Sequence, residues 1–321
     1  MDLSIIIVNW NTCGILRDCL ASIRGSRGNM EIEVFVVDND SSDGSGEMVK
    51  NDFPEVHLIN SGENLGFGKA NNLAIPKAEA PYILFLNPDT IVNHGVLDKM
   101  HAFLNEHPET GIVSCKIYDE TGCVAELPLQ TEKTPFKRFF LEIFFSTASA
   151  SVIKKIFPSH NPHESGYVKN LYGPCLMIRK EVLDEVGYFD EQFFMYAEDI
   201  DLCERIYKKG WRLYYISDVD IIHLGGQASD AAPKEFGIVT MCDSISKLMN
   251  KNYGVKGAVV YQLGVLVSSI LRLAILSFLI NIDYMTGRKK RLKYQYSWHK
   301  HIIMLKWSLT LRMFKWIESH G

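Results

Sequence analysis

An acidic residue lies directly after an apolar run, where it could hold a metal ion. Asp89 ends the motif Asn87-Pro88-Asp89, which follows the apolar residues 82–86. Asn-Pro-Asp is ordinary turn chemistry, so a turn explains this motif by itself. A carboxylate beyond the end of a buried strand would also suit Mg²⁺ or Mn²⁺, both of which bind oxygen ligands.

A second group of acids lies in the sequence YAEDIDLCER at 196–205. Asp201 and Arg205 are four residues apart in a helix predicted from about residue 199 to 209, and this spacing is typical of a structural ion pair. Glu198 and Asp199 can form an acidic first turn that the helix dipole favours. One of them could instead act as a general base, which requires a carboxylate beside the hydroxyl that loses its proton.

One histidine, His223 in the sequence IIHLGG, follows the last predicted strand of this region. Its imidazole can hydrogen-bond to the backbone or bind a metal ion, and a nitrogen ligand would favour Mn²⁺ over Mg²⁺. Both interpretations remain open at this point.

The elements that must position these residues alternate along the chain. Apolar, β-branched runs lie at 3–8, 33–37, 56–60 and 82–86, and helical patterns separate them. Continuous apolar runs are typical of parallel strands buried on both faces. The alternation predicts an α/β fold with a mainly parallel central sheet covered by helices.

Each predicted strand ends in a polar cluster. These clusters are Asn9-Trp10-Asn11, Asp38-Asn39-Asp40, residues 60–64 and Asn87-Pro88-Asp89. The carboxyl ends of parallel strands share one edge of the sheet, and open α/β folds bind ligands there. We therefore expect one binding site at this edge.

Common phosphate-binding motifs are missing. No GxGxxG follows the first strand, and no GxxxxGK[ST] occurs in the sequence. The sequence LGFGKANN at 65–72 contains glycines but is weak evidence by itself. A Rossmann dehydrogenase, a P-loop NTPase and a nucleotidyltransferase that makes sugar nucleotides therefore fit poorly.

The composition is that of a globular intracellular protein. The 321 residues are 47% hydrophobic and 22% charged, and the seven cysteines are scattered without a metal-type spacing. We expect reduced thiols rather than a disulfide framework. The N-terminus lacks the basic region and cleavage site of a signal peptide, so we expect a first strand there.

Charge divides the chain into two predicted domains. Residues 1–230 carry 20 Lys and Arg against 34 Asp and Glu, whereas residues 231–321 carry 14 against 4. We expect different partners for the two regions, with a basic, apolar, helical region after residue 230. An aromatic and basic helical segment at 135–157 looks like an insertion into the first domain.

Six ordered sequence blocks resemble the inverting family 2 glycosyltransferases. They are SIIIVNWN, VFVVDNDSSDGS, NLGFGKANN, LFLNPDT, the stretch from GPCLMIRKE to DLCERI, and IIHLGG, between residues 3 and 226. Their order and spacing look most like the rhamnosyltransferase-like branch, which extends bacterial surface polysaccharides. The resemblance implies a GT-A fold with a nucleotide-binding half and an acceptor-binding half.

The resemblance also implies a donor site. Asn9, Asn11 and Asp38 would line the base and ribose pocket, where a carboxylate that only accepts hydrogen bonds favours the N3–H of uracil or thymine. In isolation, Asp38-Asn39 would be an Asx turn. Further substrate-binding positions are expected at Asn39, Asn64, Gly66, Asn71, Glu198 and Trp211.

The reacting groups follow from the same resemblance. Asp89 stands at the last position of the family's Asp-x-Asp metal motif, whose first position is Asn87 here, and His223 can add a ligand for Mg²⁺ or Mn²⁺. Asp199 would be the base that deprotonates the acceptor hydroxyl in a single inverting displacement.

These implications give an expected function and a rival. We expect sugar transfer from a UDP- or dTDP-sugar, dTDP-L-rhamnose first, to a glycan or polyprenyl-linked acceptor, with no nucleic-acid partner. The rival is a catalytically silent, membrane-anchored protein that binds sugar nucleotides or glycans. Such a protein would keep the pocket and lose the base, and Asp199 argues against it.

Residues 258–282 are apolar and long enough to suggest a transmembrane helix. Two features count against a single crossing of the membrane. Arg272 lies in the middle of the apolar run, and residues 287–295 carry five cations. We expect a helix lying in the interface of the cytoplasmic membrane, or a returning hairpin, with residues 288–293 and Trp298, Trp307 and Trp316 among anionic headgroups. A core helix packed on the catalytic domain is the alternative.

Overall fold

The structure is a computed structural model, and it describes residues 1–125, 134–147, 160–225, 234–286 and 291–310. The chain divides into two compact units. One comprises residues 1–130 and 159–231, and the other comprises residues 131–158 and 232–321. We call them the α/β unit and the helical unit.

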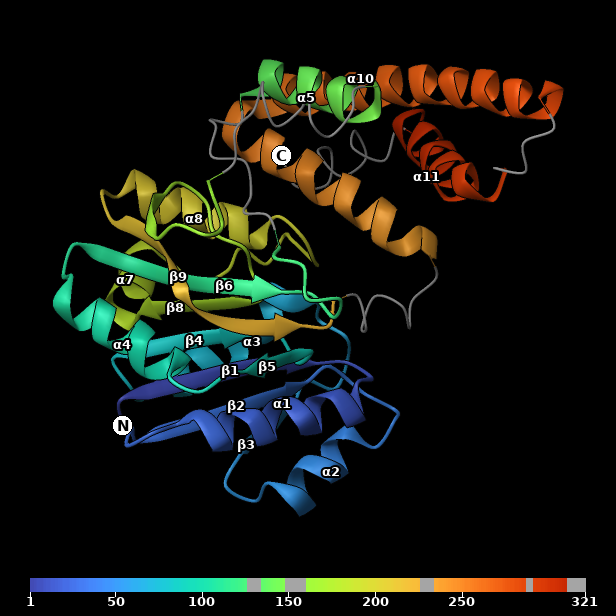
Figure 1. The fold of residues 1–321 in the computed structure, drawn as a ribbon. Helices are drawn as coiled ribbons and strands as arrows, with labels where there is room; N and C mark the ends of the chain where they lie inside the picture. The colour runs from blue at the N-terminus through green and yellow to red at the C-terminus, as the bar shows by residue number, and fades with distance from the viewer. Residues whose placement is uncertain (126–133, 148–159, 226–233, 287–290, 311–321) are drawn as a thin grey trace. The chain divides into compact units, whose positions relative to one another are not determined.

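The α/β unit is built on one mixed sheet with the strand order β3-β2-β1-β4-β8-β6-β9-β5, and β7 pairs with β9 (Figure 1). The bounds are β1 Leu3–Asn9, β2 Ile32–Asp38, β3 His57–Asn60, β4 Tyr82–Leu86, β5 Thr90–Val92, β6 Thr110–Tyr118, β7 Gly166–Val168, β8 Cys175–Arg179 and β9 Arg212–His223. The first four strands are parallel, as predicted. Beyond them β8 runs antiparallel to both β4 and β6, so the sheet is mixed.

Helices cover both faces of this sheet. They are α1 Cys13–Ser26, α2 Ser45–Asp52, α3 Phe67–Ala74, α4 Val96–Glu106, α7 Lys180–Val186 and α8 Glu198–Lys208, with a short 3-10 helix at Ile75–Lys77. One hydrophobic core contains side chains of α1, α2 and α4, and a second contains side chains of α3, α7 and α8.

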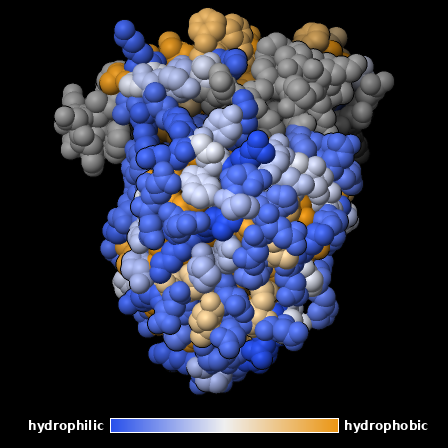
Figure 2. Space-filling model, turned by 90° about the vertical axis from the view of Figure 1, so that its left-hand side faces the viewer, coloured by the Kyte–Doolittle hydropathy of each residue, from blue (hydrophilic) through white to orange (hydrophobic). Residues whose placement is uncertain are grey.

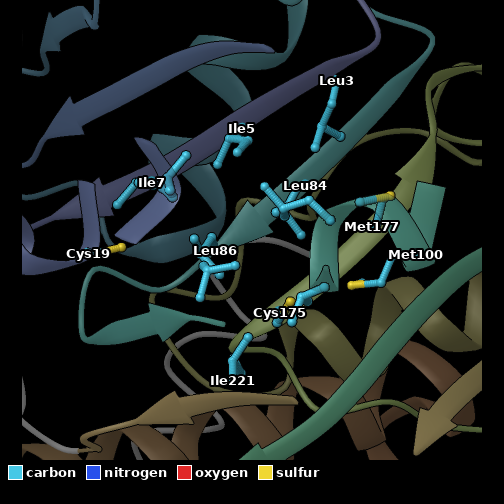
Figure 3. Close-up of a cluster of buried hydrophobic side chains, with 14 of the residues drawn as sticks. Leu3, Ile5, Ile7, Cys19, Leu84, Leu86, Met100, Cys175, Met177 and Ile221 are labelled. Atoms are coloured by element: carbon cyan, nitrogen blue, oxygen red, sulfur yellow. The ribbon is translucent and has the colours of Figure 1, made fainter. Parts of the chain in front are cut away.

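The alternation of side chains along each strand explains why there are two cores. Leu3, Ile5 and Ile7 of β1 belong to the first core, in which Leu84 and Leu86 of β4 lie beside them (Figure 3). Ile6 and Val8 point to the second core. Successive strand residues face opposite sides, so a strand covered on both sides must be apolar throughout.

The strand register brings the predicted polar clusters to one edge. Asn9 is paired with Asp38, and Asp38 with Asn60, at the carboxyl ends of β1, β2 and β3. Leu86, the last residue of β4, is paired with Ile7 of β1, two residues before Asn9. The predicted shared edge is confirmed.

Arg205 fixes the position of helix α8. It forms the predicted pair with Asp201, at 2.8 Å, and donates hydrogen bonds to the carbonyls of Val186, Gly187 and Tyr188, each at 2.8 Å. One guanidinium therefore joins α8 to the loop after α7. The N-terminus of α8, which carries Glu198 and Asp199, is held by this anchor.

The helical unit contains α5 Pro135–Thr147, α10 Lys234–Met285 and α11 Arg291–Ser308. Gly254 has φ 67° and divides α10 into two helices. α5 packs closely on the second of these, where a side chain on Gly264 would lie 3.1 Å from the Cα of Phe139. α11 returns beside it, since Gln262 donates to the carbonyl of Ser308 at 2.8 Å.

One face of the second half of α10 is apolar and exposed. Leu263, Ile270, Phe278 and Met285 recur at helical spacing and are 47%, 52%, 66% and 85% exposed. Hydrophobic residues of the helical unit are visible on the surface drawn in Figure 2, whereas the surface of the α/β unit there is mostly hydrophilic. By length and composition, α10 is the one described helix that could cross a membrane, a test that buried core helices also pass.

One expectation for this region is wrong. Trp307 is 5% exposed, and its Nε1 donates to Asp243 Oδ1 at 2.6 Å, so it serves the packing of α11 on α10 rather than a headgroup contact. Residues 148–157 of the expected insertion, the cations 288–290, and Trp316 lie outside the described residues.

Candidate functional site

The predicted nucleoside pocket begins with a buried pair at the ends of β1 and β2. Asn9 Nδ2 donates to Asp38 Oδ1 and to Ser41 Oγ, both at 3.1 Å. Thr12 Oγ1 donates to Asn9 Oδ1 at 2.6 Å, which fixes the orientation of the amide. Among the described residues, Asp38 Oδ2 accepts only the backbone N–H of Ser41, at 3.4 Å, so it has capacity to accept another hydrogen bond.

Two left-handed residues shape the loops above this pair. Asn11 has φ 53° and Asp40 has φ 64°. Asn11 Oδ1 accepts the backbone N–H of Ser42 at 2.8 Å, which ties the β1 loop to the β2 loop. Such conformations cost energy and are concentrated at functional sites in proteins.

The structure brings together three predicted substrate-binding residues, Asn39, Asn64 and Gly66. Their polar groups form hydrogen bonds with one another. Asn39 Nδ2 donates to the Gly66 carbonyl at 3.0 Å, and Asn64 Oδ1 accepts the Gly66 N–H at 3.0 Å. Gly66 has φ 77°, and a side chain there would lie 2.1 Å from the carbonyl oxygen of Phe194. These three residues shape the pocket wall by holding two loops in close contact.

Helix α3 is fastened to the loop after α7. Asn72 Nδ2 donates to the Phe189 carbonyl at 2.9 Å and its Oδ1 accepts the Phe189 N–H at 3.1 Å. The neighbouring Asn71 is fully buried, and its Nδ2 donates to the Phe67 carbonyl at 3.0 Å. Among the described residues, Asn71 Oδ1 has no hydrogen-bond partner.

The predicted metal ligands form a compact pair. Asp89 Oδ1 lies 3.1 Å from His223 Nε2, and Asn87 Nδ2 lies 3.4 Å from the same nitrogen. The antiparallel pairing of Thr90 in β5 with His223 in β9 creates this contact. Within the described residues, no group of three or more His, Cys, Asp and Glu side chains is arranged to hold a metal ion.

The donor set of this pair fits a divalent ion. Two ligands that bind one octahedral ion at about 2.1 Å and at right angles lie about 3 Å apart, close to the separation of Asp89 Oδ1 and His223 Nε2. The carboxylate supplies charge, and the imidazole suits Mn²⁺.

Glu198 and Asp199 follow a strained turn. Tyr196 and Ala197 are both left-handed, with φ 68° and 66°, immediately before α8 begins. Asp199 Oδ1 accepts the N–H of Ile200 at 2.8 Å. Asp199 Oδ2 faces Gly173, because a side chain on Gly173 would lie 3.0 Å from this oxygen.

Glu198 is buried beneath the site. It is 7% exposed, and its Oε2 has no hydrogen-bond partner among the described residues. Burial, and after it the charge of Asp199, raise the pKa of Glu198 from 4.5 to about 8. This shift favours the protonated form of Glu198 at neutral pH.

Residues 172–174 were not predicted to belong to the site, yet they connect its parts. The Tyr172 and His223 rings meet edge to face, with centroids 6.3 Å apart. Gly173 approaches Asp199, and the Pro174 carbonyl accepts the Asn87 N–H at 3.0 Å. Gly173 and Pro174 begin one of the six blocks that resemble the family, but a Gly-Pro pair before a strand by itself indicates no more than a turn.

Trp211 is not brought to the site. It immediately precedes β9, at the opposite end of this strand from His223, and its Nε1 donates to Glu185 Oε2 at 2.8 Å. Its ring packs against the second core.

Comparison with known sequences identifies relatives of the chain. Residues 4–187 match Glycosyl transferase family 2. The N-acetylglucosaminyl-diphospho-decaprenol L-rhamnosyltransferase of Mycobacterium tuberculosis is 29% identical over 210 residues, covering 60% of this chain and 66% of that protein. Rhamnosyltransferase WbbL of Escherichia coli is 30% identical over 170 residues, covering 51% and 62%. The chain thus spans less than two thirds of either relative's length. The predicted resemblance to the rhamnosyltransferase-like branch is confirmed by these relatives.

A solved structure supports the fold. The mannosyltransferase PcManGT of Pyrobaculum calidifontis, solved with GDP-Man and Mn²⁺, has a TM-score of 0.58 at 17% identity, covering 96% of this chain and 86% of that one. Together with the family match, this likeness confirms the predicted GT-A fold.

The buried acid predicts a pH dependence of stability. Between pH 4.5 and about 8 the folded chain keeps a proton on Glu198 that the unfolded chain has released. The folded state binds more protons there, so the free energy of unfolding falls as pH rises through this range. Glu198→Gln should remove this fall and be more stable than wild type near pH 8, but similar near pH 4.5. Thermal unfolding across this range measures it, with exposed Glu106→Gln as the control. Equal slopes for wild type and Glu198→Gln would contradict a neutral Glu198.

Proposed function

Because the chain belongs to glycosyl transferase family 2, we propose that it transfers a sugar from a UDP- or dTDP-activated donor, with inversion at the anomeric carbon. L-rhamnose is the proposed sugar, since two relatives are named as rhamnosyltransferases. The proposed acceptor is a glycan or polyprenyl-linked sugar of a surface polysaccharide, and one of these relatives is named for a diphospho-decaprenol compound.

One observation carries this proposal: a single loop contacts Asp199 and also the segment that carries Asp89. Gly173 lies against Asp199, and Pro174 is hydrogen-bonded to Asn87, two residues before Asp89. A base beside the acceptor and a metal site beside the leaving diphosphate must flank the same anomeric carbon in a single displacement. The spacing of these contacts supports that arrangement.

In the proposed mechanism Asp199 is the base. Its Oδ1 is held by the N–H of Ile200, so Oδ2 would accept the acceptor's proton as the acceptor oxygen attacks the anomeric carbon. Burial raises the pKa of Glu198 to about 8 and so favours its protonated form near neutral pH, which leaves Asp199 as the proposed base. No covalent intermediate with the enzyme is required.

The other residues would bind the donor. Asp38 Oδ2 would accept the N3–H of uracil or thymine, while Asn9 holds the carboxylate in place. Asp89 and His223 would hold Mg²⁺ or Mn²⁺, and a bound ion would neutralise charge on the departing diphosphate. Asn11 would line the base and ribose pocket together with Asn9 and Asp38.

We also propose that the helical unit lies on the cytoplasmic face of the plasma membrane without crossing it. α11 carries His299, Lys300 and Lys306 and runs beside α10, where Arg272 Nε donates to Ser297 Oγ at 3.3 Å. A bilayer-spanning α10 would draw these charges into hydrocarbon, which is costly. In an interfacial position, the apolar face of α10 contacts the acyl chains while the charged side chains remain among headgroups and water.

The first test addresses the base. Donors are screened by released UDP or dTDP, and Asp199→Asn is then compared with wild type at the selected donor. The amide keeps the shape but cannot accept the proton, so turnover should fall about 10²-fold or more while donor binding persists. Asp184→Asn, which changes an exposed acid of α7 in the same way, is the control. Wild-type turnover by Asp199→Asn would rule out this base, and a wild type that binds donors but transfers nothing would favour the silent binding protein.

The second test addresses the metal. Asp89→Ala should weaken nucleotide binding in the presence of Mn²⁺ and leave binding without Mn²⁺ nearly unchanged, because only the ion-bridged contact is lost. Calorimetry of UDP and dTDP binding, with and without Mn²⁺, measures both. Equal losses in the two conditions would make Asp89 a turn residue.

The third test addresses the membrane. The full-length protein should sediment with vesicles that contain anionic lipid, and the double variant Ile270→Glu with Phe278→Glu should remain in the supernatant, because it places charge on the apolar face. Asn51→Glu, at an exposed polar position of α2 in the α/β unit, is the control. Deletion of residues 258–321 should likewise release the α/β unit. A full-length protein that stays in solution without detergent or lipid would overturn the proposal.

A further inference from the structure

Tyr172 is an aromatic residue at the site that the proposed chemistry has not used. It lies between β7 and β8, and it is 39% exposed although it adjoins buried groups. Its ring meets the His223 ring at an interplanar angle of 83°. An aromatic side chain that is part exposed beside a proposed metal ligand has surface available for a bound molecule.

The backbone on both sides of Tyr172 is fixed. Gly173 is seated against Asp199, and the Pro174 carbonyl accepts the Asn87 N–H at 3.0 Å. Cys175 then enters β8, paired with Leu86 of β4. The ring is thereby held at a defined place in the site, which keeps the entropic cost of binding against it small.

The contacts around Tyr172 locate it within the proposed reaction geometry. Its ring meets the ring of His223, which lies 3.1 Å from Asp89, and the next residue, Gly173, lies against Asp199. In an inverting displacement, the base and the leaving diphosphate lie on opposite faces of the anomeric carbon. A side chain close to both groups therefore lies beside the sugar ring that is transferred.

We propose that the aromatic ring of Tyr172 is the platform against which the transferred sugar packs. The inference rests on the proposed function. Aromatic faces carry partial negative charge, and the C–H groups on one face of a pyranose are weakly positive and apolar, so the two surfaces are complementary. A deoxy sugar with a methyl group would offer more apolar surface to this ring than a fully hydroxylated sugar.

This role predicts which part of the donor Tyr172 recognises. The ring would contact the sugar and not the nucleoside diphosphate, which is assigned to Asn9, Asp38, Asp89 and His223. Loss of the ring should therefore weaken binding of a sugar nucleotide selectively. Loss of the hydroxyl alone should have little effect.

The experiment compares binding of dTDP-L-rhamnose and dTDP to the full-length protein in detergent with Mn²⁺, by calorimetry. Tyr172→Ala should weaken dTDP-L-rhamnose about tenfold and dTDP less than about twofold, and Tyr172→Phe should stay within about twofold of wild type for both. Tyr167→Ala is the matched control, because Tyr167 is 44% exposed but pairs with β9 and bonds to Glu109. If neither dTDP compound binds wild type, UDP and UDP-N-acetylglucosamine replace them.

The outcomes separate this inference from the proposed function. Equal weakening of the diphosphate and the sugar nucleotide by Tyr172→Ala, or no weakening, would overturn the platform while the donor site stands. A loss in Tyr172→Phe as large as in Tyr172→Ala would assign the contact to the hydroxyl and also overturn it. Failure of wild type to bind either pair would overturn the proposed function and this inference together.

Discussion

The parallel pairing of β1 with β2 and β4 is the constraint on which the site depends. It sets Asn9 beside Asp38 and brings the end of β4, and with it Asn87 and Asp89, to the same edge. A shift of one residue would turn every apolar side chain of β1 from one core to the other, because successive residues face opposite sides. Burial on both faces thus fixes the register, and the register fixes the pocket.

Close backbone contacts join the second half of the sheet to this edge. β8 runs antiparallel to β4, so the loop before it returns to the carboxyl ends of the parallel strands. Two glycines permit the approach: a side chain on Gly66 would collide with the Phe194 carbonyl, and one on Gly173 would crowd Asp199. The loop before β8 can therefore contact both Asp199 and, through Pro174, the Asn87 that precedes Asp89.

Adjacent acids acquire different properties in this arrangement. Two left-handed residues, Tyr196 and Ala197, begin α8 abruptly, which buries Glu198 and leaves Asp199 beside Gly173. Burial, and after it the charge of Asp199, raise the pKa of Glu198 to about 8, and Asp199 is the acid that we propose as the base. The strained turn is stabilised by the packing around α8, including the hydrogen bonds of Arg205.

The amino-acid sequence by itself determined the parallel strands, the shared polar edge and the family, because apolar periodicity and motif order are local properties of the chain. It did not determine that β8 reverses direction, that Tyr172 joins the site, or that Trp211 lies at the far end of β9. These depend on contacts between residues distant in the chain, which leave no local pattern. The burial that raises the pKa of Glu198 is likewise a property of packing, so only the tertiary structure could show it.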